Sequence, residues 1–124
     1  MKLSLDHIHI QSSDPEATKA FLARTFDATD EWVIDFGGVV ITRMHLAGSH
    51  INIFHRAPTT DGPNPNDAAI HHFAMATDDF EGTVAQLRER GANIVDGPRK
   101  MKNMDVVFVS GPDNLLIEVL HGTP

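Results

Sequence analysis

The residues of this chain that are best suited to chemistry are its histidines and one isolated carboxylate. Eight of the 124 residues are histidine and none is cysteine. Glu118 interrupts the otherwise apolar run Leu115–His121. A charged side chain is seldom placed in such a run unless another group compensates for its loss of water. Because imidazole and carboxylate groups are common ligands of divalent metals, metal binding is the first chemistry to consider.

The pattern around Glu118 occurs twice in the chain. The segment Ile51–Pro58 lies 66 residues before Ile117–Pro124, and the two share Ile, His and Pro at matching positions. Asn52 occupies the place that Glu118 has in the second copy. The residue that interrupts the apolar pattern is therefore polar in both copies.

A second pair of segments repeats at almost the same offset. Residues 7–22 match residues 72–87 at an offset of 65, with six identical positions. Two helices with similar N-caps would explain the shared acidic residues but not the pairing of His7 with His72. We therefore interpret the chain as a duplication.

The duplication sets the expected order of secondary structure, which is β-α-β-β-β in each half. Alternating and amphipathic patterns distinguish strands from helices. Ser13 and Asp78 are the expected helix N-caps, because each precedes a glutamate by three residues. The expected helices run from these caps to about residues 26 and 90, and the expected strands are 3–11, 32–36, 39–46, 50–56, 70–77, 92–95, 105–110 and 115–121.

Size and composition are those of one ordinary globular domain. Hydrophobic residues make up 41% of the chain and charged residues 22%, which is enough to form a sizeable core. We expect module one at residues 1–58, a linker at 59–68 and module two at 69–124. The expected fold is α+β, with two paired βαβββ modules forming a cupped eight-stranded mixed sheet and two helices on the outer faces.

Strand parity indicates which side chains can meet. In each half, the apolar neighbours of the repeated polar residue point toward the helix, and the polar residue points the other way. If a pseudo-twofold axis relates the halves, four side chains would meet on a concave face: His7, Asn52, His72 and Glu118. Two imidazoles, a carboxylate and a carboxamide suit a divalent ion such as Zn, Ni, Mn, Co or Fe.

Four further residues are candidates for the same face. His9 lies two residues from His7 and is expected to act as an acid–base group, with a buried structural histidine as the alternative. Arg43, His45 and His50 are candidate substrate contacts, since Arg43 and His45 share one face of their strand and His50 has the parity of Asn52. Arg43 could pair with an anionic substrate, although a solvated edge position would explain it equally well.

Charge and composition also argue against several functions. The net charge of -7 disfavours nucleic acid as a partner. No apolar stretch approaches a membrane span, and no basic run suits an anionic membrane surface. Without cysteine there are no disulfides, thiolate ligands or cysteine nucleophiles. The first residues lack the apolar core of a signal peptide, so we expect a cytoplasmic protein.

The sequence resembles the vicinal oxygen chelate superfamily, which includes glyoxalase I, methylmalonyl-CoA epimerase, fosfomycin-resistance enzymes, extradiol dioxygenases and bleomycin-binding proteins. The resemblance covers essentially the whole chain. It rests on Leu5–Ile10 before an Asp-Pro helix, Ile70–Ala74 before an Asp-Asp-Phe helix, and Gly111–Asn114 leading into Ile117-Glu118.

The resemblance implies paired modules around a divalent metal, with ligands at His7, His72 and Glu118. Glyoxalases and epimerases have a fourth ligand, Glu or Gln, where this chain has Asn52. Asn is a shorter and weaker ligand, so Asn52 is expected either to bind weakly or to lie behind the ligands or against substrate.

The activity expected from this resemblance is that of a metal-dependent lyase, isomerase or epimerase. A small substrate would chelate the metal through neighbouring oxygens, and a base such as His9 or a metal-bound hydroxide would remove a proton next to a carbonyl. Two alternatives remain open: an Fe(II)-dependent extradiol-type dioxygenase that uses two histidines and one carboxylate, and a metal-free antibiotic-binding resistance protein. We expect a homodimer, with the site either within one chain or shared between two.

Overall fold

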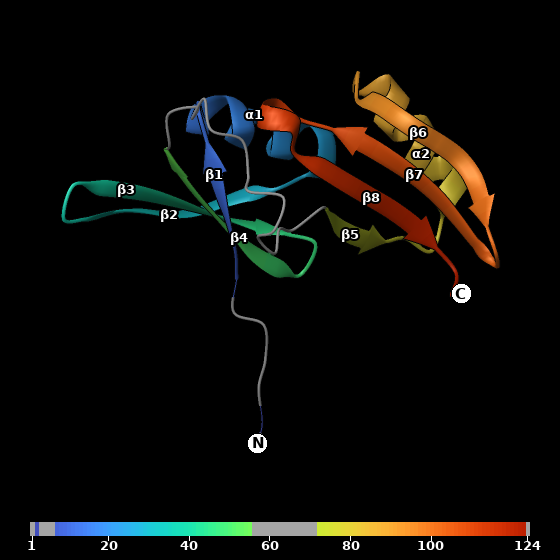
Figure 1. The fold of residues 1–124 in the computed structure, drawn as a ribbon, viewed down its shortest axis with the longest axis horizontal. Coiled ribbons are helices and arrows are strands. Elements are labelled where there is room, and N and C mark those ends of the chain that lie inside the picture. The colour runs from blue at the N-terminus through green and yellow to red at the C-terminus, as the bar shows by residue number, and fades with distance from the viewer. Residues whose placement is uncertain (1, 3–6, 56–71, 124) are drawn as a thin grey trace, which may run out of the picture. The chain divides into compact units, whose positions relative to one another are not determined.

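The structure is a computed structural model that describes residue 2, residues 7–55 and residues 72–123. The chain divides into two compact units, Met1–Pro58 and Thr59–Pro124. Each unit holds one helix and one four-stranded sheet (Figure 1). The expected linker 59–68 lies outside the described residues, and the single-domain organisation stays a prediction.

The first unit has the element order β-α-β-β-β. Its sheet has the strand order β1-β4-β3-β2, in which β1 runs parallel to β4 and the other neighbours are antiparallel. The elements are β1 (Ile8–Ser12), α1 (Pro15–Phe26), β2 (Thr29–Phe36), β3 (Val39–Leu46) and β4 (Ser49–His55).

The second unit repeats this topology. Its sheet order is β5-β8-β7-β6, again with one parallel pair, β5 and β8. The elements are β5 (Phe73–Ala76), α2 (Phe80–Glu89), β6 (Asn93–Met101), β7 (Met104–Ser110), the short 3-10 helix η1 (Pro112–Asn114) and β8 (Leu116–His121). Two mixed four-stranded sheets with two helices confirm the α+β prediction of two βαβββ modules.

Strand pairing follows the duplication residue by residue. His9 lies opposite Asn52 in the parallel pair of the first unit, and Ala74 lies opposite Glu118 in that of the second. These partners are related by the offsets of 65 and 66 found in the sequence. Asn52 and Glu118 are therefore equivalent positions in the two sheets.

The helix N-caps differ from the sequence prediction by one residue. The Asp14 carboxylate, not Ser13, accepts a hydrogen bond from the Ala17 amide at 3.1 Å. Pro15 explains the shift in α1, because its fixed φ suits the first helical position and leaves the preceding residue as N-cap.

The N-cap of α2 shows the same shift. The Asp79 carboxylate, not Asp78, accepts a hydrogen bond from the Gly82 amide at 3.0 Å. A hydroxyl pair supports each cap: Ser12 contacts Thr18 at 2.7 Å, and Thr77 contacts Thr83 at 2.9 Å. The two helix starts are thus built alike, as the duplication requires.

Two strands are longer than predicted because bulges interrupt their alternating patterns. β2 begins at Thr29, three residues before the expected start at residue 32, and is irregular between Asp30 and Trp32. β6 continues past the expected end at residue 95 to Met101, with irregularities on both sides of Asp96. An extra residue changes which face the following side chains occupy while pairing continues. The alternating sequence pattern alone therefore underestimates the length of both strands.

Each sheet buries an apolar face. In the first unit, Ile51 and Ile53 are 1% exposed, as is Met44 on the neighbouring strand. The helix α1 contributes Phe21 and Leu22 to this core, and burying each such side chain stabilises the fold by about 1.5–3 kcal/mol. In the second unit, Val107, Val109, Ile117 and Val119 are buried on one face of the sheet, and Val84 and Leu87 are buried on α2. Val106 is buried on the opposite face. The polar residues between Ile51 and Ile53 and between Ile117 and Val119 point to the opposite face.

Neither α1 nor α2, the helices of the described chain, is long and apolar enough to cross a membrane.

Candidate functional site

Glu118 is paired with His72 within the second unit. Nε2 of His72 lies 3.1 Å from Oε2 of Glu118, and Glu118 is only 7% exposed. The parallel pairing of β5 with β8 brings them together, because Ala74 lies opposite Glu118 and His72 is two residues before it on the same face. The Phe108 ring meets the His72 ring edge-on at 5.4 Å. His72 is therefore the partner that the position of Glu118 in an apolar strand led us to expect.

These two side chains fit the requirements of a divalent metal site. Ligand nitrogen and oxygen atoms lie about 2.0–2.2 Å from a bound ion, so two ligands of one ion can be 3.1 Å apart, as Nε2 and Oε2 are here. A buried carboxylate beside a half-buried imidazole also matches the donor types that such ions prefer. His72 and Glu118 can thus serve as two of the ligands.

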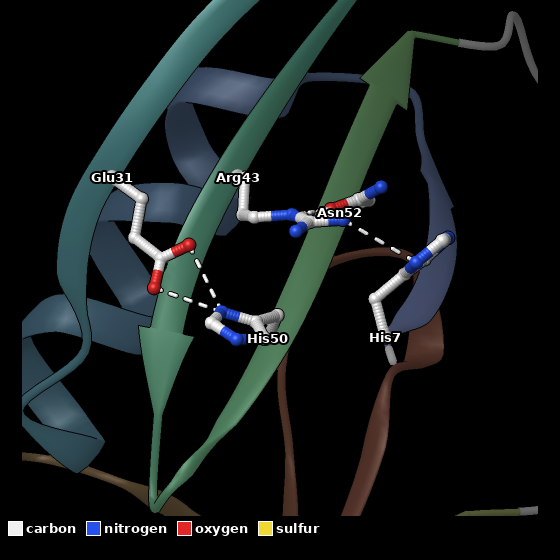
Figure 2. A network of polar contacts seen from close by, with 5 residues as sticks. All are labelled: His7, Glu31, Arg43, His50 and Asn52. Atoms are coloured by element: carbon white, nitrogen blue, oxygen red, sulfur yellow. Dashed lines mark hydrogen bonds and ion pairs between the residues drawn. The ribbon is translucent and has the colours of Figure 1, made fainter. Parts of the chain in front are cut away.

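Arg43 occupies the centre of the corresponding face in the first unit. It lies on β3 directly opposite Asn52 on β4. Its Nε donates a hydrogen bond to Oδ1 of Asn52 at 2.7 Å, and its Nη2 lies 3.3 Å from Nδ1 of His7 (Figure 2). The guanidinium also stacks over the Trp32 ring, with Cζ 4.7 Å from the ring centroid. Asn52, which is 5% exposed, therefore holds an arginine.

The arginine affects how well His7 and Asn52 would suit a metal ion. Because Arg43 can only donate hydrogen bonds, Nδ1 of His7 must accept, and the proton of the neutral ring then lies on Nε2. His7 can bind an ion through Nε2 only after it changes tautomer and gives up this contact. Asn52 fits poorly as a ligand, because its carbonyl oxygen faces a permanent positive charge.

His9 shares this face with His7. Their rings are 5.9 Å apart in an edge-on arrangement, and the His9 ring lies 4.7 Å from that of Phe54. Partial burial, and secondarily repulsion from His7 when that ring is protonated, lower the pKa of His9 below its usual value. Both effects favour the neutral form of the His9 ring, which can accept a proton.

His50 and Glu31 form a second polar pair on the first sheet. Nδ1 of His50 lies 2.8 and 2.9 Å from the two carboxylate oxygens of Glu31 (Figure 2). The ring of His45 lies 6.0 Å from that of His50. Glu31 and Trp32 were not among the candidates from the sequence. Trp32 could have been found from the Gly37-Gly38 turn, which fixes the hairpin register that places it opposite Arg43. Glu31 lies in the bulge between Asp30 and Trp32, and no sequence pattern predicts where its side chain points.

The candidate residues thus fall into one cluster in each unit. The first unit gathers His7, His9, Arg43, His45, His50 and Asn52, and the second unit gathers His72 and Glu118. Among the residues that the structure describes, no three His, Asp or Glu side chains form a group that could hold a metal ion. A three-ligand site that joins both units stays a prediction.

Comparison with known proteins gives a family match and several structural relatives. A family model described as "Glyoxalase/Bleomycin resistance protein/Dioxygenase superfamily" matches residues 4–119. No curated protein sequence matches the chain.

Solved structures share the fold over nearly the whole chain. A glyoxylase/bleomycin resistance protein/dioxygenase domain from Frankia sp. EAN1pec is 14% identical, with 99% of this chain and 100% of that chain covered and a TM-score of 0.82. The fosfomycin resistance protein FosX from Listeria monocytogenes, in complex with Mn(II) and sulfate, is 20% identical, with 99% and 95% covered and a TM-score of 0.70. FosX from Mesorhizobium loti is also 20% identical, with 99% and 94% covered and a TM-score of 0.71. At these identities the likeness shows a common fold.

Proposed function

Because the chain belongs to the glyoxalase, bleomycin resistance protein and dioxygenase superfamily, we propose that it is a divalent-metal-dependent enzyme. It acts as a lyase, isomerase or epimerase on a small oxygenated substrate. The observation that carries this proposal is the buried Glu118 carboxylate, whose oxygen lies 3.1 Å from Nε2 of His72. Burying such a charge is costly, and a cation at this place would compensate for the cost.

The proposed ligands are His72 and Glu118 from the second unit and His7 from the first. The Listeria relative is in complex with Mn(II), which supports the use of a divalent ion by this chain. When bound, such an ion supplies Lewis-acid stabilisation of negative charge on a substrate oxygen. Asn52 is left out of the ligand set because Arg43 engages its carbonyl oxygen.

The chain's own residues would bind the substrate and move its proton. His9 is the proposed base: it lies beside His7, and its neutral ring can accept a proton at pH 7. Arg43, His45 and His50 line the same face and are the proposed substrate contacts. Arg43 would bind negative charge, and the imidazoles would exchange hydrogen bonds with substrate oxygens.

Thermal unfolding of chelator-treated protein tests the metal site. Mn, Zn, Ni, Co and Fe(II) are added separately, and the ion that binds should raise the melting temperature. Glu118→Gln and His72→Gln should abolish this increase, whereas Glu89→Gln and His121→Gln, at exposed positions, should retain it. Stabilisation that is unchanged in Glu118→Gln would refute the ligand assignment. If none of the ions raises the melting temperature, a metal-free antibiotic-binding resistance protein becomes the better hypothesis.

The stabilising metal then defines the activity screen. The loaded protein is assayed against α-oxo thiohemiacetals, acyl-CoA esters, catechols and fosfomycin. Turnover that depends on that metal and is lost in Glu118→Gln would support the enzyme, and His9→Gln should lower kcat. Turnover at the same rate after removal of the metal would refute the proposal.

One observation favours a dioxygenase as the second candidate. With Asn52 engaged by Arg43, the proposed ligands are two histidines and one carboxylate, the set that binds Fe(II) in many oxygenases and leaves positions open for O2 and substrate. Oxygen uptake by the Fe(II)-loaded protein in the presence of a catechol would select this candidate, and turnover without O2 would exclude it.

We also propose a homodimer, in which His7 and Glu118 come from the same chain or from two chains. Light scattering tests the assembly. Mixing the inactive His7→Ala and Glu118→Ala variants tests the sharing, because activity returns on mixing only if one site draws ligands from both chains.

A further inference from the structure

The two units differ most in the charge beside their equivalent histidines. Arg43 pairs with Asn52 across β3 and β4, and the equivalent pair in the second unit is Phe108 with Glu118 across β7 and β8. As a result, His7 meets a guanidinium where His72 meets a carboxylate. We propose that Arg43 is an oxyanion-binding residue for a carboxylate, phosphate or phosphonate group, and that Asn52 is the positioning residue that fixes it.

Asn52 holds the guanidinium in one orientation. The Nε–Oδ1 distance of 2.7 Å is short for a hydrogen bond from nitrogen, as expected when the donor is charged. Asn52 is buried, so its amide gains from a partner within the protein. Because Nε is the inner nitrogen of the guanidinium, this bond fixes the direction in which the group leaves the side chain.

Trp32 fixes the plane of the same group. The ring lies 4.7 Å from Cζ of Arg43, within the range of a cation–π contact. An arginine held at its Nε and stacked on an aromatic ring loses less side-chain freedom when it binds an anion than a free arginine would. The arrangement thus prepares Arg43 to bind a ligand.

The contacts that hold the guanidinium in place do not neutralise its positive charge. They come from the amide oxygen of Asn52, the imidazole of His7 and the indole of Trp32. Glu31, a carboxylate on the same sheet, contacts His50 through both of its oxygens. Guanidinium groups bind carboxylate and phosphate oxygens in pairs of parallel hydrogen bonds. A small oxyanion is therefore the ligand that this environment suits.

This inference deepens the proposed function, and rests on it only in assigning the anion to the substrate of the metal site. The substrate would carry a carboxylate, phosphate or phosphonate group close to the oxygens that react. Binding of the anion by Arg43 is a property of the first unit's residues and needs no metal.

Trp32 provides a direct test. The chain contains one tryptophan and no tyrosine, so its intrinsic emission reports on the ring that stacks with Arg43. Chelator-treated protein is titrated with inorganic phosphate, methylphosphonate and acetate, with sodium chloride keeping the ionic strength constant. A saturable change in emission is expected for at least one of them, and comparison of the three identifies the preferred oxyanion.

Variants of Arg43 decide whether it binds the anion. Arg43→Met should abolish the change and Arg43→Lys should weaken it, because lysine lacks the paired donors. Arg24→Met, which removes the same charge from an exposed position of α1, should behave like the unaltered protein. The proposal is overturned if Arg43→Met responds normally or if chloride alone produces the same change.

Variants of Asn52 separate positioning from metal binding. Asn52→Leu should raise the phosphate Kd on the order of tenfold, since it removes a hydrogen bond to a charged group. Asn52→Asp should weaken phosphate binding at least as much, because its carboxylate would neutralise Arg43. A metal-ligand role predicts the opposite for Asn52→Asp, namely unchanged phosphate binding and stronger stabilisation by Mn(II). Circular dichroism verifies that each variant folds. If Asn52→Leu does not fold, Asn52→Asp, which conserves the side-chain volume, still distinguishes a positioning role from a metal-ligand role.

Failure of one proposal can be distinguished from failure of the other. Loss of metal stabilisation in the Glu118 and His72 variants concerns the second unit, and the phosphate titration concerns the first. Phosphate binding without metal stabilisation would leave the Arg43 assignment standing and remove the metal enzyme. Metal stabilisation without an Arg43-dependent phosphate response would support the metal site and overturn the assignment of Arg43.

Discussion

Asn52 and Glu118 occupy equivalent positions in two sheets of the same topology, yet one binds an arginine and the other a histidine. Asn52 accepts a hydrogen bond from Arg43 at 2.7 Å, and Glu118 lies 3.1 Å from His72. The backbone around each is the same, with an apolar neighbour on either side packed into the core. The duplication therefore preserved the scaffold and changed the charge that each half presents.

Substitution of the helix caps distinguishes the N-cap residues seen in the structure from those predicted from the sequence. Asp14→Ala and Asp79→Ala should each lower the free energy of unfolding by about 1 kcal/mol, because each removes a side-chain acceptor from the first turn of a helix. Urea denaturation measures the change. Ser13→Ala and Asp78→Ala are the matched controls and should change stability less. A larger loss in the controls would mean that the capping-box assignment was right.

A core substitution tests the buried face of the first sheet. Ile53 is 1% exposed and Val40, on the neighbouring strand, is 51% exposed. Ile53→Ala should destabilise the protein by about 2–5 kcal/mol through lost burial and the cavity left behind. Val40→Ala should change the free energy of unfolding by less than about 1 kcal/mol. Similar losses at both positions would contradict the difference in burial between Ile53 and Val40.

The pKa of His9 gives a prediction for the metal-free protein. Burial and the charge of His7 lower this pKa, so NMR titration of the ring protons should give a midpoint below the usual value of about 6.5. His7→Gln should raise the midpoint only in part, because the contribution of burial remains. His45→Gln, which alters a more distant ring, should leave it unchanged.

The same shift links stability to pH. The unfolded chain protonates His9 more readily than the folded one, so the contribution of His9 to stability is complete above pH 6.5 and is lost as the pH falls through and below that value. Urea unfolding of the unaltered protein and of His9→Gln at several pH values checks the sign. A His9 midpoint at or above the usual value would contradict both statements.

Anion binding and metal binding should be coupled through His7. When an oxyanion takes the Nη2 donor of Arg43, Nδ1 of His7 is free to carry the ring proton, which leaves the lone pair of Nε2 for a metal ion. Methylphosphonate should then tighten Mn(II) binding roughly fivefold or more. Calorimetry with and without the anion measures this effect.

The control for this coupling is again a pair of arginine variants. Arg43→Met should remove the effect of methylphosphonate on Mn(II) affinity, and Arg24→Met should preserve it. Because coupling is reciprocal, Mn(II) should also tighten the binding of methylphosphonate by the same factor. An anion that weakens Mn(II) binding would show that Arg43 and the ion do not share His7 in this way.

Much of this arrangement could be predicted from the sequence because two-residue turns fix strand register. The Ala47-Gly48 turn places Arg43 opposite Asn52, and the Gly37-Gly38 turn places Trp32 opposite Arg43. The parity of the apolar residues then gives the face. The contacts of Arg43 with Asn52 and His7, and of His72 with Glu118, could not be read from this pattern, since they depend on side-chain geometry.

The parts that could not be predicted are those that break a regular period. Glu31 contacts His50 because a bulge adds one residue to β2, and such an insertion has no fixed sequence signature. The Asp14 cap was missed because Ser13 has the correct spacing to a glutamate, while the geometry of Pro15 decides the helix start. Local spacing and backbone geometry compete at such positions, and the backbone prevails.

The irregular strands have a consequence for the behaviour of the protein at high concentration. β2 and β6 are the last strands in their sheet orders, and both carry irregularities. A straight, unpaired edge is a template for adding strands of other molecules, and kinks, proline and charge discourage this. β6 has all three, since Pro98, Arg99 and Lys100 follow its break at Asp96. A redesign that smoothed these edges to make the sheets more regular would therefore invite fibrous aggregation.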